Sequence, residues 1–183
     1  MRILLLLLAL AALGSSATLK LTMRNDNPLV VARRCCAQQH VECCRKAFNF
    51  LLPVECANMT ISERMDAISC AQKGFYGEKQ LEKLNIHDFE CCEVFGTNDN
   101  DPENVCQDRC MKALQTPSLP LEQKMDRIHF CRLGNFNVAK CFNRCLHWRR
   151  HNNTDGNSPF IYGDHCSWVD RLLPGKLYIG PPV

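Results

Sequence analysis

Residues 27–53 read NPLVVARRCCAQQHVECCRKAFNFLLP, and this stretch decides the fold. Asn27 suits the N-cap of a helix and Pro28 suits its first turn. Apolar residues then recur at steps of 3, 4, 7, 4 and 3 until Pro53 ends the pattern. They are Leu29, Ala32, Cys36, Cys43, Ala47 and Phe50. This helical spacing predicts one continuous helix with two pairs of adjacent cysteines, which a strand would divide between its two faces.

The rest of the chain carries further apolar stripes at helical spacing, and no segment alternates as a strand would. Thr60 and Glu63 have the spacing of a capping box, and Asn85 is expected to interrupt a helix over 79–92. The stripes are Ile61, Met65 and Ile68; Leu81, Leu84 and Phe89; Cys106, Cys110 and Leu114; Leu121, Met125 and Ile128, before a C-cap at Gly134; and Val138, Cys141, Cys145 and Trp148. We therefore predict an all-α, small disulfide-rich domain of about six short helices, with an irregular C-terminal tail.

The N-terminus has the pattern of a signal peptide. Arg2 precedes an apolar run over 3–13, and small residues allow cleavage after Ala17. The run is too short for a membrane span, and residues 176–183 lack a GPI signal, so the mature protein is expected to be secreted, extracellular and not inserted into a membrane. Its balance of 21 basic and 19 acidic residues gives no reason to expect nucleic acid as a partner.

Fourteen cysteines in a secreted chain predict a disulfide framework. Adjacent cysteines, and those four apart on a helix, are poorly placed for mutual bonds, so each is expected to bond to another helix. No connectivity is assigned. The cysteines are Cys35, Cys36, Cys43, Cys44, Cys56, Cys70, Cys91, Cys92, Cys106, Cys110, Cys131, Cys141, Cys145 and Cys166.

The order of the cysteines suggests two similar halves. From Cys35 to Cys70 they run two, two, one, one, and from Cys91 to Cys141 they do so again. Residues 64–68 (RMDAI) and 124–128 (KMDRI) precede a cysteine in each half, which favours a duplicated helical unit. Cys145 and Cys166 are left over, and we expect them to close a C-terminal loop together.

The twelve cysteines from Cys35 to Cys141 resemble the DB module, an extracellular domain of secreted and cell-surface nematode proteins. The closest local matches are residues 70–74 (CAQKG) and 106–110 (CQDRC), although the adjacent second pair and two long spacings depart from the family. The resemblance implies no general biochemical activity. Together with the N-terminal pattern, this resemblance divides the chain into a signal peptide over 1–17, an N-terminal segment over 18–27, a DB-like module over 28–148 and a C-terminal extension over 149–183.

One motif permits an enzymatic alternative. His87 and Asp88 stand beside Cys91 and Cys92, as a His-Asp pair stands beside paired cysteines in secreted phospholipases. The order is reversed and the residues 74–77 do not form a glycine-rich calcium loop, so the His would lack its electrophilic partner. We predict that Asp88 instead lies near the positive end of a helix dipole.

A second motif contains ligand-like pairs, Cys141 with Cys145 and His147 with His151. Zinc sites separate such pairs by a long turn, so disulfides with exposed histidines are the favoured interpretation, and no metal or cofactor is expected. His40 is interpreted as a partly buried residue. The dibasic pair over 33–34 is interpreted as a solvated helical face.

The sequence therefore favours a non-enzymatic secreted module that binds an extracellular protein or ligand. An aromatic and two cations, Trp148, Arg149 and Arg150, form a candidate contact surface for an acidic partner, or a helix end whose cations complement the dipole. Asn58 and Asn152 begin N-glycosylation sequons. The alternatives are a small hydrolase acting through His87 and Asp88, and a toxin-like or inhibitory protein with a loop over 98–101.

Overall fold

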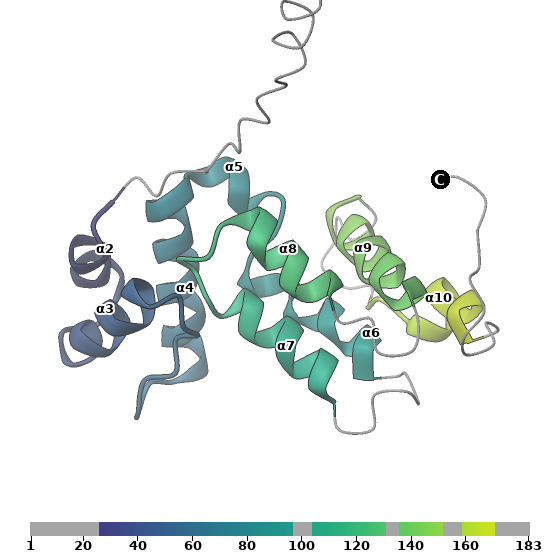
Figure 1. Ribbon diagram of the computed structural model, residues 1–183, viewed down its shortest axis with the longest axis horizontal. Coiled ribbons are helices and arrows are strands. Elements are labelled where there is room, and N and C mark those ends of the chain that lie inside the picture. The colour runs from purple at the N-terminus through teal and green to yellow at the C-terminus, as the bar shows by residue number, and fades with distance from the viewer. Residues whose placement is uncertain (1–25, 97–103, 131–135, 152–158, 171–183) are drawn as a thin grey trace, which may run out of the picture.

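The computed structural model describes residues 26–96, 104–130, 136–151 and 159–170, and within them the chain is helical without strands (Figure 1). The all-α prediction is confirmed. The helices, with η marking 3₁₀ turns, are α2 (Pro28–Cys35), η2 (Gln38–His40), α3 (Val41–Asn49), α4 (Ile61–Tyr76), α5 (Glu78–Leu81), η3 (Ile86–Cys92), α6 (Glu93–Gly96), α7 (Val105–Leu114), α8 (Leu121–His129), α9 (Phe136–His151) and α10 (Tyr162–Asp170). The last of these lies in the segment expected to be irregular.

The prediction of one continuous helix over 27–53 is wrong. Asn27 caps α2 as expected, accepting a hydrogen bond from the Leu29 N–H at 2.8 Å, but α2 ends at Cys35 and Cys36 is extended. The reason is a disulfide between Cys36 and Cys44, whose Cα atoms lie 6.7 Å apart. Residues eight apart on a straight helix are separated by about 12 Å, so this bond requires the chain to fold back into two packed helices.

The other helix starts follow the sequence more closely. Thr60 and Glu63 form the expected capping box at the start of α4, with reciprocal bonds of 2.8 and 3.2 Å. Asn85 is extended and caps η3, so the break expected near this residue is confirmed. Gly77 ends α4 with a φ of +79°, a conformation that residues with a Cβ rarely adopt.

Two disulfides of the first half have counterparts in the second half. In the first half, bonds join Cys35 to Cys70, Cys36 to Cys44, and Cys43 to Cys56. In the second half, bonds join Cys91 to Cys145 and Cys92 to Cys110. In each half, the first cysteine of the leading adjacent pair therefore bonds to the last helix of that half's pattern, α4 or α9. The second cysteine bonds to the next helix that carries cysteines, α3 or α7.

This topology corrects two sequence-based expectations. Cys145 does not bond to Cys166: it takes the place in the second half that Cys70 has in the first, and Cys166 bonds to Cys141. The equivalent helices are thus α4 and α9. The short match between 64–68 in α4 and 124–128 in α8 does not mark equivalent helices.

Each half has its own aromatic pair in the core. Phe48 and Phe75 meet edge-on with ring centroids 5.5 Å apart, between α3 and α4. Phe95 and Phe142 lie 5.9 Å apart, between α6 and α9. All four side chains are buried, and a continuous set of buried residues joins the two pairs. In Figure 1, α7 and α8 lie between the α2–α4 group and the α9–α10 group.

The two halves are joined by polar contacts and packing, not by disulfides. All six cysteines up to Cys70 bond among themselves, so none is left to reach the second half. Instead the Tyr76 hydroxyl donates to the Ser118 carbonyl at 2.5 Å, and the Val54 N–H donates to the Gln115 carbonyl at 3.0 Å. The halves are therefore linked covalently by the peptide chain alone.

Several predictions concern residues outside the described ranges. These are the signal peptide over 1–17, the N-terminal segment up to residue 25, the loop over 98–101, Cys131, the C-cap at Gly134, the sequon at Asn152 and the tail beyond residue 170.

Candidate binding surface

The predicted contact residues lie at the end of α9, where it packs on η3. Arg150 donates to Asp88 Oδ2 at 2.7 Å, to the Glu82 carbonyl at 2.6 Å and to its own helix at the Leu146 carbonyl at 2.9 Å. The guanidinium therefore satisfies acceptors from two other segments of the chain. Arg150 therefore links the last turn of α9 to the first turn of η3.

Asp88 is the buried partner in this contact, with 5% of its side chain exposed. Its carboxylate also accepts the Asn85 backbone N–H at 2.8 Å, as the third residue of the η3 capping box. Burial raises the pKa of Asp88, against the lowering effects of the Asn85 N–H and Arg150. The expected position at the positive end of a helix is confirmed, and the carboxylate is held in a structural role.

Trp148 and Arg149 also have partners within the chain. Arg149 pairs with Glu90, and the Trp148 ring lies 4.3 Å from the His165 ring of α10. Trp148 is half-buried, while Arg149 and Arg150 keep about a quarter of their side-chain surface exposed. The end of α9 is thus first a contact between helices, and its role toward a partner stays a prediction.

The structure does not bring His87 and Asp88 together as a dyad. His87 is exposed and its Nε2 lies 3.5 Å from Ser69 Oγ, whereas the Asp88 carboxylate is held by Asn85 and Arg150. Without a carboxylate on the imidazole, the arrangement lacks the group that orients a histidine base in hydrolases. These contacts give the hydrolase alternative no support.

Cys141 and Cys145 are both in disulfides, so neither thiolate is free to bind zinc. The rings of His147 and His151 lie 4.3 Å apart on the exposed face of α9. In the described ranges, no group of three histidine, cysteine or acidic side chains could hold a metal ion. His40 is 6% exposed, more deeply buried than the sequence suggested.

A buried cation that sequence reasoning missed lies between the halves. Lys124 of α8 is fully buried and donates to Gln72 Oε1 of α4 at 2.9 Å, while Gln72 Nε2 donates to the Leu84 carbonyl at 2.6 Å. Burial lowers the pKa of Lys124 to about 7, against an opposing attraction to Asp88. The sequence does hold a signal for this burial, because Lys124 lies three residues after Leu121 and four before Ile128, on the apolar face of α8. A lysine at such a position is usually solvated, which is why the pattern alone did not single it out.

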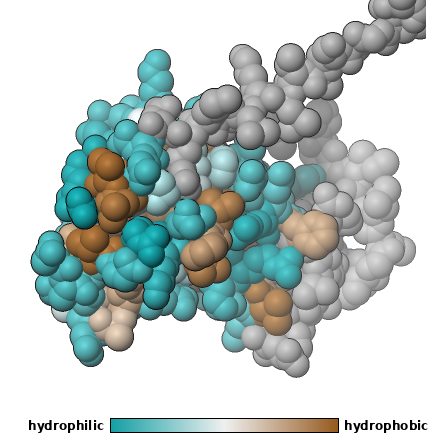
Figure 2. All heavy atoms as spheres, turned by 60° about the vertical axis from the view of Figure 1, so that its left-hand side comes forward, coloured by the Kyte–Doolittle hydropathy of each residue, from teal (hydrophilic) through white to brown (hydrophobic). Residues whose placement is uncertain are grey.

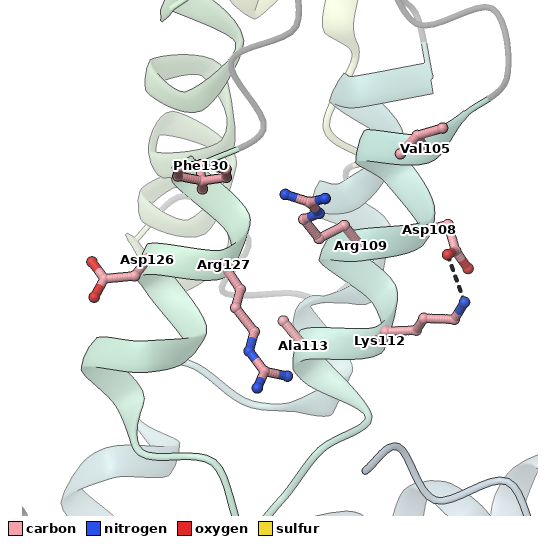
Figure 3. A pocket seen from close by; sticks show the side chains of 8 residues that line it. All are labelled: Val105, Asp108, Arg109, Lys112, Ala113, Asp126, Arg127 and Phe130. Atoms are coloured by element: carbon pink, nitrogen blue, oxygen red, sulfur yellow. Dashed lines mark ion pairs between the residues drawn. The ribbon is translucent and has the colours of Figure 1, made fainter. Parts of the chain in front are cut away.

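One hollow on the surface lies between α7 and α8. This α7–α8 groove has a volume of about 530 Å³ and is lined by Val105, Asp108, Arg109, Lys112, Ala113, Asp126, Arg127 and Phe130 (Figure 3). Elsewhere, on the face seen in Figure 2, apolar residues form separate patches among hydrophilic ones. Sequence reasoning missed the groove because its walls come from two helices whose facing sides only the fold defines.

The helical architecture and its bonds define the class of protein: a disulfide-rich, all-helical domain. The chain belongs to the family described as "Caenorhabditis elegans Her-1", which matches residues 24–170. It is 28% identical over 139 residues to "Protein her-1" of Caenorhabditis elegans, a match that spans 75% of this chain and 79% of that protein.

The fold is similar to that in "Crystal Structure of C. elegans HER-1". The TM-score is 0.67 at 24% identity, covering 78% of this chain and 99% of that one. The family match takes in all the cysteines on which the DB-module resemblance rests, and it is the Her-1 family that the comparison names. No helix in the described part of the chain has the length and apolar character of a membrane span.

Proposed function

We propose that the protein is a secreted, non-enzymatic module that binds an extracellular protein. The observation that carries this proposal is the disulfide framework: every cysteine that the structure describes is bonded, and the bonds join most of the described helices. Such a framework suits an oxidising compartment and fixes helix faces for recognition. Membership of the Her-1 family supports a disulfide-rich domain of this class.

The same proposal covers the leader and the glycans. Residues 1–17 act as a cleaved signal peptide, and Asn58 and Asn152 carry N-linked glycans. Asn58 is exposed, in a left-handed turn immediately before α4, so a glycan there has room in the folded state. N-terminal sequencing and glycosidase treatment of secreted protein test both points. We also keep the DB-module resemblance as a proposal, because the order of the first twelve cysteines supports it.

A cell-surface capture experiment tests the binding role. The mature glycosylated protein, expressed from secreting cells with an affinity tag, is incubated with intact cells of the source tissue, crosslinked and recovered. The expected result is repeated recovery of the same extracellular protein. A reduced and alkylated sample is the control, because it keeps the composition but loses the framework. Recovery of the same proteins by both samples, or of none, would contradict the proposal.

A further inference from the structure

The α7–α8 groove presents two guanidinium groups that no carboxylate of the described residues neutralises. Arg109 projects from α7 and Arg127 from α8, and both point into the space between the helices (Figure 3). Both side chains are exposed, and in the described part of the chain neither forms an ion pair. The groove thus carries two available positive charges on opposite walls.

The other charges on the lining do not cancel these two. Asp108 is paired with Lys112 at 2.7 Å on the outer side of α7, so this pair is neutral as a unit. Asp126 projects away from the space between the helices (Figure 3). The interior of the groove is therefore positive, although the chain as a whole has a formal charge of only +3.

Apolar surface lies beside the two cations. Phe130, at the end of α8, is 70% exposed, and Val105, at the start of α7, is 39% exposed. The Arg109 guanidinium carbon lies 5.8 Å from the centroid of the Phe130 ring, which orients the cation over an aromatic face. Exposed aromatic and arginine side chains in one place are the residues that contribute most to protein interfaces.

We infer that the α7–α8 groove binds an acidic segment of a partner protein. A carboxylate of that segment lies between Arg109 and Arg127, and an apolar neighbour packs on Phe130. This inference rests on the proposed function and assigns it a site. Guanidinium groups bind carboxylates through paired, charge-assisted hydrogen bonds, and the groove, with a volume of about 530 Å³, is open to solvent and can admit a chain segment. A sulfated glycan fits less well, because a polyanion is matched by a row of cations and the lining offers only two available ones.

A random twelve-residue peptide library displayed on phage provides the probe. Selection on the folded, oxidised protein is expected to enrich peptides with Asp or Glu beside an apolar residue. A synthetic peptide from the leading clones should bind the double variant R109E/R127E about tenfold or more weakly, and F130A about threefold or more weakly. The control K79E/K83E makes the same charge change at two exposed lysines outside the groove and should bind as the wild type does. Helical circular dichroism and the disulfide count by mass spectrometry verify that each variant is folded.

Two results would overturn the inference. One is the absence of an acidic, apolar consensus, or equal binding of the selected peptide to R109E/R127E. The other is retention on heparin that depends on Arg109 and Arg127 without any peptide consensus, which would assign the groove to a sulfated glycan. Cell-surface capture separates the site from the function: if R109E/R127E still captures the wild-type partner, the groove is the wrong site while the binding function stands. If the wild type captures nothing, the binding function itself is wrong.

Discussion

Replacing the buried Lys124 with methionine should change how stability depends on pH. Lys124 is fully enclosed between α8 and α4, and its pKa of about 7 is well below the ordinary lysine value. Methionine has a similar length and carries no charge, so K124M removes the titration without opening a large cavity. The relevant measurement is the free energy of unfolding of both proteins from pH 6 to pH 9, with all disulfides intact.

The expected size follows from the two pKa values. In the unfolded chain this lysine titrates near 10.4. Between about 7 and about 10 the unfolded state therefore binds more protons than the native state, so native stability rises with pH, by up to about 1.4 kcal/mol per unit. Below pH 7 both states are protonated and the full cost of burying the charge is present. From pH 7 to pH 9 the wild type should gain roughly 2 kcal/mol relative to K124M.

The pH slope is a better readout than the absolute stability. Methionine leaves Gln72 Oε1 without its hydrogen-bond donor, which costs about 1–3 kcal/mol of stability. At neutral pH this cost offsets part of the stability gained by removing the buried charge. Urea titrations followed by circular dichroism give the free energies, and K79M, which removes an exposed lysine, should keep the wild-type slope. If K124M and wild type showed parallel pH profiles, the lysine would not titrate near pH 7 and the reasoning would be refuted.

Other substitutions test single contacts. Thr60→Ala removes the α4 capping box and should lower stability by about 1 kcal/mol in thermal unfolding; an unchanged midpoint would contradict the role of the cap. Arg150→Ala leaves the buried carboxylate of Asp88 without its cation and should lower the free energy of unfolding by about 2 kcal/mol or more. Arg149→Ala leaves the exposed carboxylate of Glu90 and should lower it by under about 1 kcal/mol. Equal costs would mean that burial of the partner does not matter. Cys166→Ser should expose one thiol, that of Cys141, and raise hydrogen exchange in α10 alone; faster exchange in α4 would contradict a local effect of this bond.

Local rules predicted the helix starts, because each depends on residues close in sequence. Asn27 and Thr60 cap helices as predicted, and Asn85 marks the expected break, where it also caps η3. The break at Cys36 could not be read in the same way. The apolar spacing continues straight through it, and only the bond to Cys44 shows that the chain must turn back.

The long-range features depended on information that the sequence pattern does not contain. Cys141 and Cys145 lie four apart on α9, and either could occupy the sixth cysteine position of the second half. The fold decides the matter, since Cys91 meets Cys145 and leaves Cys141 for Cys166. Similarly, a lysine on a helix is usually solvated, and only the fold shows that Lys124 is buried and reaches Gln72 of α4.

The closed set of bonds in the first half has a consequence for how the chain finds its native pairing during synthesis. A ribosome delivers Cys35 to Cys70 before any later thiol, and those six already contain all of their own partners. A search among six thiols covers on the order of ten pairings, and a search among the remaining eight covers on the order of a hundred, against on the order of 10⁵ for all fourteen at once. Synthesis from the N-terminus thus divides the search for the native disulfide pairing into two much smaller searches. Refolding from the fully reduced, full-length chain loses that division, so scrambled isomers should accumulate in the test tube far more than in the cell.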